Sequence, residues 1–304
     1  MSKIAHSSRP AIAALAVLSA IWGYNWVVMK NVLQFSSPLD FAALRTLLGA
    51  AGLFLVLAWK RRPLRPKAVP LTLLLGVLQT TGFMGLTMTA LVSGGVGNTA
   101  ILVYTMPFWV LVLAWRLLGE RIRGMQWLAV GLAFAGLVLV VRPWMLHGTL
   151  TAKLLALSAS VCWAASVVVA KVLRRKTAVD LISLTAWQML FGGIPLALLA
   201  ILVPSPPIQW SGYLIGALIY NVVLATALAW LLWLYVLREL PAGMAGMGIL
   251  AVPLVGVFSA WVQLGERPGG IEAWGMLLIG AALALLSFLA SSRPSRVDPT
   301  IAQE

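Results

Sequence analysis

The feature that most constrains the fold of this chain is a series of long, unbroken apolar segments joined by short polar connections. Each segment is about 20 residues long, which is the length of helix needed to cross a bilayer. Charged residues make up only 10% of the chain, whereas a soluble domain carries roughly a quarter. Every backbone polar group inside a bilayer must be satisfied internally, and uninterrupted apolar runs favour helices over a barrel. We therefore predict an all-α membrane protein with ten transmembrane helices, at residues 11–32, 38–59, 70–92, 95–116, 125–142, 151–173, 179–203, 212–237, 241–264 and 271–290.

The 22 lysines and arginines are distributed unevenly between the connections. If the N-terminus is cytoplasmic, nearly all of them fall in cytoplasmic segments. The exceptions are Lys30, Arg142, Lys153 and Arg267 on the external side, and Arg45 within the second span. This bias follows the positive-inside rule and predicts a bacterial-type inner-membrane protein with cytoplasmic tails at 1–10 and 291–304. The net charge of +14 is thus a topology signal, and no nucleic-acid partner is expected.

The two halves of the chain repeat one pattern. Trp22 and Lys30 bracket a Val-Val pair, as Trp163 and Lys171 do. The segment Leu-Gly-Glu-Arg occurs at 118–121 and again at 264–267, and Pro107 and Pro253 take matching places before the two copies. Such agreement indicates an internal duplication.

Each half contains five predicted helices, an odd number, so the second half must insert upside down relative to the first. We predict a 5+5 inverted repeat, with one unit at 11–142 and the other at 151–290. Inverted repeats recur in secondary transporters, where the substrate lies near the midplane between the halves.

The doubled Leu-Gly-Glu-Arg, the proline in both preceding helices, the early Trp-Gly and the glycine-rich fifth and tenth helices resemble EamA-type members of the drug/metabolite transporter superfamily. The resemblance covers about residues 11–290. It implies a permease in which helices 1–4 and 6–9 line a central cavity while helices 5 and 10 lie at the periphery. It also implies export of amino acids and other metabolites, as in many such proteins. The small multidrug pumps of the superfamily carry a glutamate in helix 1, where this chain reads Trp-Gly-Tyr-Asn-Trp at 22–26.

Acidic residues are confined to helix ends and the C-terminal tail. They are Asp40, Glu120, Asp180, Glu239, Glu266, Glu272, Asp298 and Glu304. Proton and cation pathways in membranes normally use buried acids, so we favour facilitated transport over coupling through a residue at the edge. The single cysteine, Cys162, and two histidines, His6 and His147, offer no disulfide, metal or catalytic cluster. We expect no cofactor and no enzymatic activity.

Several charged residues have a structural interpretation beside a functional one. Asp40 and Asp180 open predicted helices, where an anion complements the helix dipole. Lys171, like Lys30, lies near a helix C-terminus and would either extend to the headgroups or act in a gate. Glu120, like Glu266, is expected to form a pair or to tie a loop to a neighbouring helix.

Polar and aromatic residues deep in the helices are the candidates for substrate binding. Trp22, Asn25, Trp26 and Met29 share one helix face, which contacts either another helix or a cavity, and the family resemblance favours the cavity. Buried amides pair between helices by default, but a convergent lining is an alternative. The predicted substrate-binding residues are Trp22, Asn25, Trp26, Arg45, Gln79, Asn98, Tyr104, Trp163, Gln188 and Asn221.

Arg45 is the one basic residue well inside a predicted span, about 10 Å along the helix from its start. It would either extend to the surface or face a cavity, where a guanidinium can grip a carboxylate with two parallel hydrogen bonds. We therefore predict a transporter, by alternating access, of small amphipathic metabolites such as amino acids, with the bilayer and this substrate as its partners. A multidrug or nucleotide/sugar carrier of the same superfamily is the alternative, ahead of a membrane enzyme or a scaffold.

Overall fold

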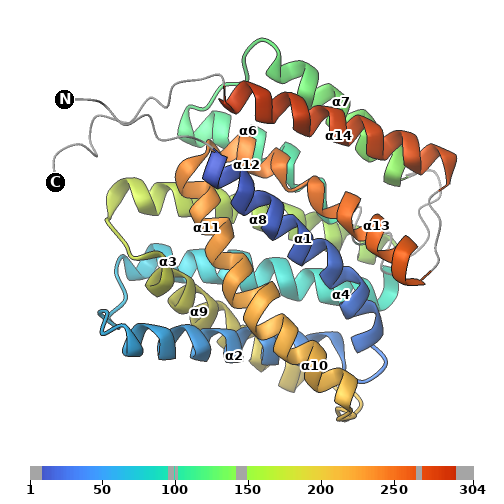
Figure 1. The fold of residues 1–304 in the computed structure, drawn as a ribbon. Helices are drawn as coiled ribbons and strands as arrows, with labels where there is room; N and C mark the ends of the chain where they lie inside the picture. The colour runs from blue at the N-terminus through green and yellow to red at the C-terminus, as the bar shows by residue number, and fades with distance from the viewer. Residues whose placement is uncertain (1–8, 95–98, 100–101, 142–148, 265–268, 292–304) are drawn as a thin grey trace.

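The computed structural model describes residues 9–94, 99, 102–141, 149–264 and 269–291, and these residues form helices and connections without a strand (Figure 1). The predicted all-α class is confirmed. The helices are α1 (Arg9–Val32), α2 (Pro38–Trp59), α3 (Val69–Gly76), the π-helical η1 (Val77–Gly85), α4 (Leu86–Gly94), α6 (Met106–Leu118), α7 (Gln126–Val141), α8 (Leu150–Lys176), α9 (Leu181–Leu202), α10 (Gly212–Tyr220), the π-helical η3 (Asn221–Leu228), α11 (Ala229–Glu239), α12 (Ala242–Gly248), α13 (Ala251–Leu264) and α14 (Gly270–Ser291).

Within the described residues, 7 helical runs are long and apolar enough to cross a membrane. They are Arg9–Met29, Pro38–Trp59, Val69–Leu91, Leu150–Lys176, Leu181–Leu202, Gly212–Glu239 and Ala242–Gln263. The three other predicted spans contain shorter apolar helices, at Met106–Leu118, Gln126–Val140 and Ala273–Leu286. Seven of the predicted spans are thus matched, and the full set of ten stays a prediction.

The starts of α2 and α9 are fixed by capping side chains. Ser37 precedes α2 and its hydroxyl accepts a hydrogen bond from the amide of Asp40, while it donates to the Asp40 carboxylate at 2.7 Å. Asp180 accepts from the amides of Ile182 and Ser183, both at 3.0 Å. These contacts satisfy amides that have no partner within a helix. The predicted capping role is confirmed for Asp180, whereas α2 is capped by Ser37 and Asp40 lies in its first turn, where its charge still complements the helix dipole.

The two prolines of the repeat coincide with interruptions of their helices. α6 begins one residue before Pro107, after a turn at Tyr104 and Thr105, and α13 begins two residues before Pro253, after a turn that follows α12. Proline lacks an amide hydrogen and its ring clashes with the preceding turn, so a continuous helix is disfavoured there. In the first break the Thr105 hydroxyl donates to the Leu102 carbonyl at 2.6 Å.

Glycines allow close contact between helices that are far apart in the sequence. α2 packs against α9, and α7 packs against α14; the latter pair lies along one edge of the molecule (Figure 1). A Cβ atom on Gly136 would lie 2.7 Å from the Gly275 carbonyl oxygen, and one on Gly275 would lie 2.7 Å from that of Gly136. Backbones this close leave no room for a side chain, as is common between membrane helices.

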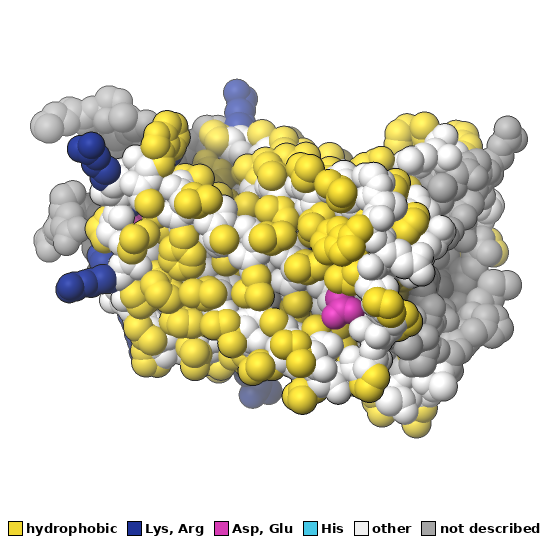
Figure 2. Space-filling view, turned by 90° about the horizontal axis from the view of Figure 1, so that it is seen from below, with side chains coloured by type: hydrophobic (Ala, Val, Ile, Leu, Met, Phe, Trp, Pro, Cys, Tyr) yellow, Lys and Arg dark blue, Asp and Glu magenta, His cyan; other side chains and the backbone are white. Residues whose placement is uncertain are grey.

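The surface of the helical bundle is largely apolar. Figure 2 shows one face covered with hydrophobic side chains, with several basic side chains projecting at its left end. Leu55 is 71% exposed, and Ile201 and Leu202 at the end of α9 are 79% and 76% exposed. Contiguous apolar surface on this scale suits contact with lipid rather than water.

Candidate functional site

A cavity of about 680 Å³, its mouth included, lies among helices from both halves of the chain. It is lined by Trp22, Asn25, Trp26, Met29, Arg45, Phe83, Met84, Thr87, Met88, Leu91, Val103, Tyr104, Trp163, Trp230 and Val252. These residues come from α1, α2, η1, α4, residues 103–104 before α6, and from α8, α11 and α13. Six of the predicted binding residues are therefore brought together: Trp22, Asn25, Trp26, Arg45, Tyr104 and Trp163.

An aromatic cluster forms one wall of the cavity. The Trp22 ring lies 4.8 Å from that of Trp230 and 5.7 Å from that of Trp163, centroid to centroid, in edge-to-face arrangements. Phe83 stacks on Trp163 at 4.6 Å. The Trp22 indole is fixed by a hydrogen bond of 3.0 Å to the Ala225 carbonyl in η3. Rings held in this way by several helices provide a rigid apolar surface.

Trp26 and Tyr104 close another part of the wall. The Trp26 indole nitrogen donates to the Tyr104 hydroxyl, and the two ring centroids are 6.0 Å apart. Tyr104 lies in the turn before α6, so the helix break at Pro107 places its ring against α1. The proline break therefore shapes the cavity.

Arg45 is the cationic group of the cavity. It is only 5% exposed, so it does not extend to the surface. Its NH1 donates to Asn221 Oδ1 at 2.7 Å and lies 3.8 Å from the sulfur of Met29. None of the ion pairs among the described residues involves Arg45. Its hydrogen-bond acceptor is thus a neutral amide, and no acid compensates its charge among the described residues.

Four buried polar atoms of cavity residues have no hydrogen-bond partner in the described part of the chain. They are Asn25 Oδ1, Arg45 Nε, Thr87 Oγ1 and Trp163 Nε1. Buried polar atoms are nearly always paired, and leaving one unpaired costs roughly 1–3 kcal/mol. The set provides donors from the arginine and the indole, an acceptor from the amide, and a hydroxyl that can serve either way. It matches a molecule that carries both an acceptor and a donor.

The other predicted binding residues lie elsewhere. Gln79 is 1% exposed and accepts a hydrogen bond from the Ser166 hydroxyl at 3.2 Å, so it joins η1 to α8. Gln188 is fully buried in α9, and neither polar atom of its amide has a partner among the described residues. Asn221 lies behind Arg45 and also donates to the Ala217 carbonyl at 3.0 Å. Asn98 lies outside the described residues.

Some lining residues were not in the predicted set, namely Met29, Phe83, Met84, Thr87, Met88, Leu91, Val103, Trp230 and Val252. For Met29 and Trp230 the sequence offers a signal, since one lies on the Trp22 face and the other is deep within a span. The others are apolar residues or a threonine within apolar helices. Their sequence context does not distinguish a cavity wall from a helix contact.

A polar junction lies at the turn between α11 and α12. Glu120 accepts from the amides of Ala242 and Gly243 at 3.1 and 3.2 Å, one through each carboxylate oxygen. Lys171 donates to the Leu240 carbonyl in the same turn. The expectation that Glu120 ties a loop to a neighbouring helix is confirmed. Glu266 and the side chain of Lys30 lie outside the described residues.

A helical bundle with apolar outer surfaces and an internal cavity is the architecture of a multi-pass membrane protein that binds a small molecule. The chain belongs to the EamA-like transporter family, whose model matches residues 9–142 and 150–288, and with it to the drug/metabolite transporter superfamily. It is a multi-pass membrane transporter.

Curated relatives cover nearly the whole chain. A transporter of Bacillus subtilis named YoaV is 29% identical over 91% of this chain and 96% of its own. A Salmonella typhimurium protein named as a probable amino-acid metabolite efflux pump is 29% identical over 93% of this chain and 96% of its own length. A solved crystal structure at 18% identity superposes with a TM-score of 0.80, covering 93% of this chain and 98% of the other, which shows a shared fold.

Proposed function

We propose that this protein exports small amphipathic metabolites that carry a carboxylate, amino acids among them, by alternating access around the described cavity. The observation that carries this proposal is Arg45, a buried cation that faces the cavity with an unpaired Nε and no acid beside it in the described structure. An arginine inside a membrane protein is retained at a cost and normally has a partner there, most favourably an anionic one. A substrate carboxylate supplies that partner.

The rest of the lining suits the remainder of such a substrate. Asn25 Oδ1 is an unpaired acceptor for an ammonium group, and Trp163 Nε1 is an unpaired donor for a carboxylate oxygen. The aromatic cluster and the methionines Met84 and Met88 provide adaptable apolar contacts for a side chain. Relatives from Salmonella typhimurium and Escherichia coli bear the name of amino-acid metabolite efflux pumps, which supports this substrate class.

The proposed architecture is ten transmembrane helices in a 5+5 inverted repeat, with units at 11–142 and 151–290. The family model matches the two halves separately, which supports a duplication. The π-helical segments η1 and η3 take matching places in the two halves, and the proline breaks do so as well. α2 and α9, which pack together, are counterparts in this scheme, as are α7 and α14. Alternating access would then exchange the roles of the two halves around the cavity.

The proposed setting is a bacterial-type inner membrane with both termini in the cytoplasm. In Figure 1 the start of α1, the end of α14 and the basic α2–α3 connection lie at the left, while the α9–α10 connection lies at the lower right. This arrangement supports placing the start of α1, the end of α14 and the α2–α3 connection on the same side of the membrane. No acidic side chain lines the cavity within the described residues, which supports facilitated transport over proton exchange.

Transport by Arg45 variants tests the proposal. Inside-out vesicles are incubated with a labelled amino acid or with its amide, and the initial uptake rates are compared. Arg45→Gln should lower the preference for the carboxylate form, and Arg45→Lys should retain part of it because the charge remains. The matched control is Arg123→Gln, a cation in the connection before α7. If Arg45→Gln transports both forms at the parental ratio, Arg45 does not bind the carboxylate.

A further inference from the structure

A second concave site lies away from the cavity, at the C-terminal end of α2 and the N-terminal ends of α3 and α9. Its main element is the connection at residues 60–68, here called the basic loop, which reads Lys-Arg-Arg-Pro-Leu-Arg-Pro-Lys-Ala. Within it Arg61 and Ala68 have positive φ angles of 51° and 46°. Such a conformation is uncommon for residues other than glycine and persists where surrounding contacts impose it.

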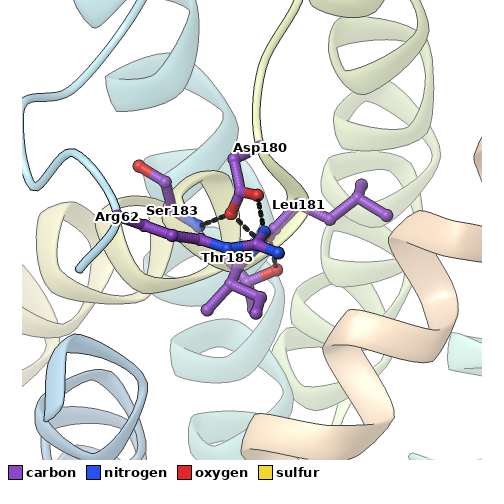
Figure 3. Close-up of polar contacts among 6 residues, drawn as sticks. Arg62, Asp180, Leu181, Ser183 and Thr185 are labelled. Atoms are coloured by element: carbon purple, nitrogen blue, oxygen red, sulfur yellow. Dashed lines mark hydrogen bonds and ion pairs between the residues drawn. The ribbon is translucent and has the colours of Figure 1, made fainter. Parts of the chain in front are cut away.

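The contacts that impose it connect the basic loop to the start of α9. Arg62 forms an ion pair with Asp180, whose carboxylate also caps α9 (Figure 3). Lys67 donates to the Ala178 carbonyl at 3.2 Å, and the Trp187 indole donates to the Leu64 carbonyl at 2.8 Å. Segments more than 110 residues apart are joined in this way. The basic loop is therefore a fixed structure.

Between the loop and α9 lies a groove of about 450 Å³, its mouth included. It is lined by Pro63, Arg65, Lys67, Thr72, Val179, Asp180, Ser183, Leu184 and Trp187. The negative charge of Asp180 is already neutralised by Arg62 and by two backbone amides. The remaining charges of the lining are the cations Arg65 and Lys67, with the Ser183 hydroxyl beside them. The groove therefore favours an anion with several acceptor oxygens, for which a phosphate is well suited.

The surroundings of the groove are those of a membrane interface. Leu64 and Val69 are 47% and 43% exposed, and Leu73, one turn further along α3, is 47% exposed. The groove lies where the candidate spans of α2, α3 and α9 end, and lipid headgroups occupy that level. Trp187 has the amphipathic ring typical of this level, and its apolar side packs on Phe54 with centroids 5.1 Å apart. A ligand with both a phosphate and acyl chains fits these features better than a free anion does.

We propose that this groove binds the phosphate headgroup of an anionic phospholipid, with Arg65 and Lys67 as its cationic ligands and Leu64, Val69 and Leu73 against the acyl chains. Clusters of basic residues next to a membrane span attract anionic lipids, and each such cation changes the affinity about fivefold. Arg65 is the sharper of the two probes. Its side chain makes no hydrogen bond or ion pair within the described residues, so its replacement leaves the loop contacts in place.

The test measures binding of a phosphatidylglycerol with a fluorescent acyl chain to the full-length protein in neutral detergent, by fluorescence anisotropy. Arg65→Gln should raise the Kd about fivefold. The matched control is Lys60→Gln, in the same loop but outside the groove, and it should change the Kd less than twofold. Arg65→Lys should retain most of the affinity. Equal effects of Arg65→Gln and Lys60→Gln would show a diffuse attraction and overturn the site.

Competition identifies the source of the phosphate. Unlabelled phosphatidylglycerol should displace the probe, phosphatidylcholine should do so much less well, and millimolar inorganic phosphate should have little effect. Displacement by inorganic phosphate at that concentration would overturn the assignment to a lipid. The size-exclusion profile of each variant confirms that the fold is intact. All these readouts are independent of transport, so they stand or fall separately from the proposed export.

Discussion

Asn221→Asp offers a direct way to occupy Arg45 from within the protein. Asn221 Oδ1 lies 2.7 Å from Arg45 NH1, and both residues are buried, at 0% and 5% exposure. The substitution keeps the shape of the side chain and replaces the amide with a carboxylate in the same place. It therefore creates an internal competitor for the carboxylate of a substrate.

The size of the effect follows from the geometry. Two unit charges about 4 Å apart attract by roughly 4 kcal/mol at an effective dielectric constant of about 20. Burial of the new carboxylate offsets part of this attraction. If a third remains, about 1.4 kcal/mol, the affinity for a competing carboxylate falls about tenfold. We expect the KM for a labelled amino acid to rise about tenfold, while the KM for its amide changes little.

Asn221→Leu is the matched control, because it also removes the amide but adds no charge. It deprives Arg45 of its oxygen acceptor within the described structure, which should lower the free energy of unfolding by about 1.5–3 kcal/mol. The KM for the carboxylate form should not rise, since the substrate then becomes the main partner of the guanidinium. Both variants are assayed by uptake into inside-out vesicles. If the aspartate and leucine variants show the same KM for the carboxylate form, Arg45 does not bind that group.

Three further predictions concern packing, capping and topology. Gly192→Ala should lower the free energy of unfolding by about 1–3 kcal/mol, because its new Cβ would lie 2.2 Å from a carbonyl oxygen of α3; Gly52→Ala, with open space around it, should have little effect in the same denaturation experiment. Glu120→Ala should remove both acceptors at the start of α12 and lower the free energy of unfolding by about 1–2 kcal/mol. A decrease below about 0.5 kcal/mol, the size expected for a surface substitution, would contradict the capping role. Cysteines at Arg62 and Ser205, introduced singly in a background without Cys162, should react differently on whole cells: a membrane-impermeant thiol reagent should label position 205 and spare 62, and the reverse pattern would overturn the topology.

The site was predictable only in part. Trp22, Asn25 and Trp26 share a helix face, and that face does line the cavity. Arg45 was identified because a cation within an apolar span is costly and therefore indicates a functional role. Gln79 has the same kind of signal, yet it pairs with Ser166 between η1 and α8 and does not line the cavity. An amide deep in a helix can either line a cavity or pair with a neighbouring helix. The sequence pattern does not distinguish these two cases.

By itself the sequence determined the features that depend on one segment at a time. A helix must be about 20 residues long to cross a bilayer, so the lengths of the apolar runs were enough to indicate the spans. The cap of α2 at Ser37 and the cap of α9 at Asp180 likewise depend only on residues close together in the chain. Tertiary structure decided which side chains from different helices contact one another. Trp22 bonds to the carbonyl of Ala225, Arg45 to Asn221 and Glu120 to the start of α12, in each case across more than 120 residues of chain. Helical periodicity fixes which side chains share a face, but only the packing of the helices decides whether that face meets lipid, another helix or the cavity.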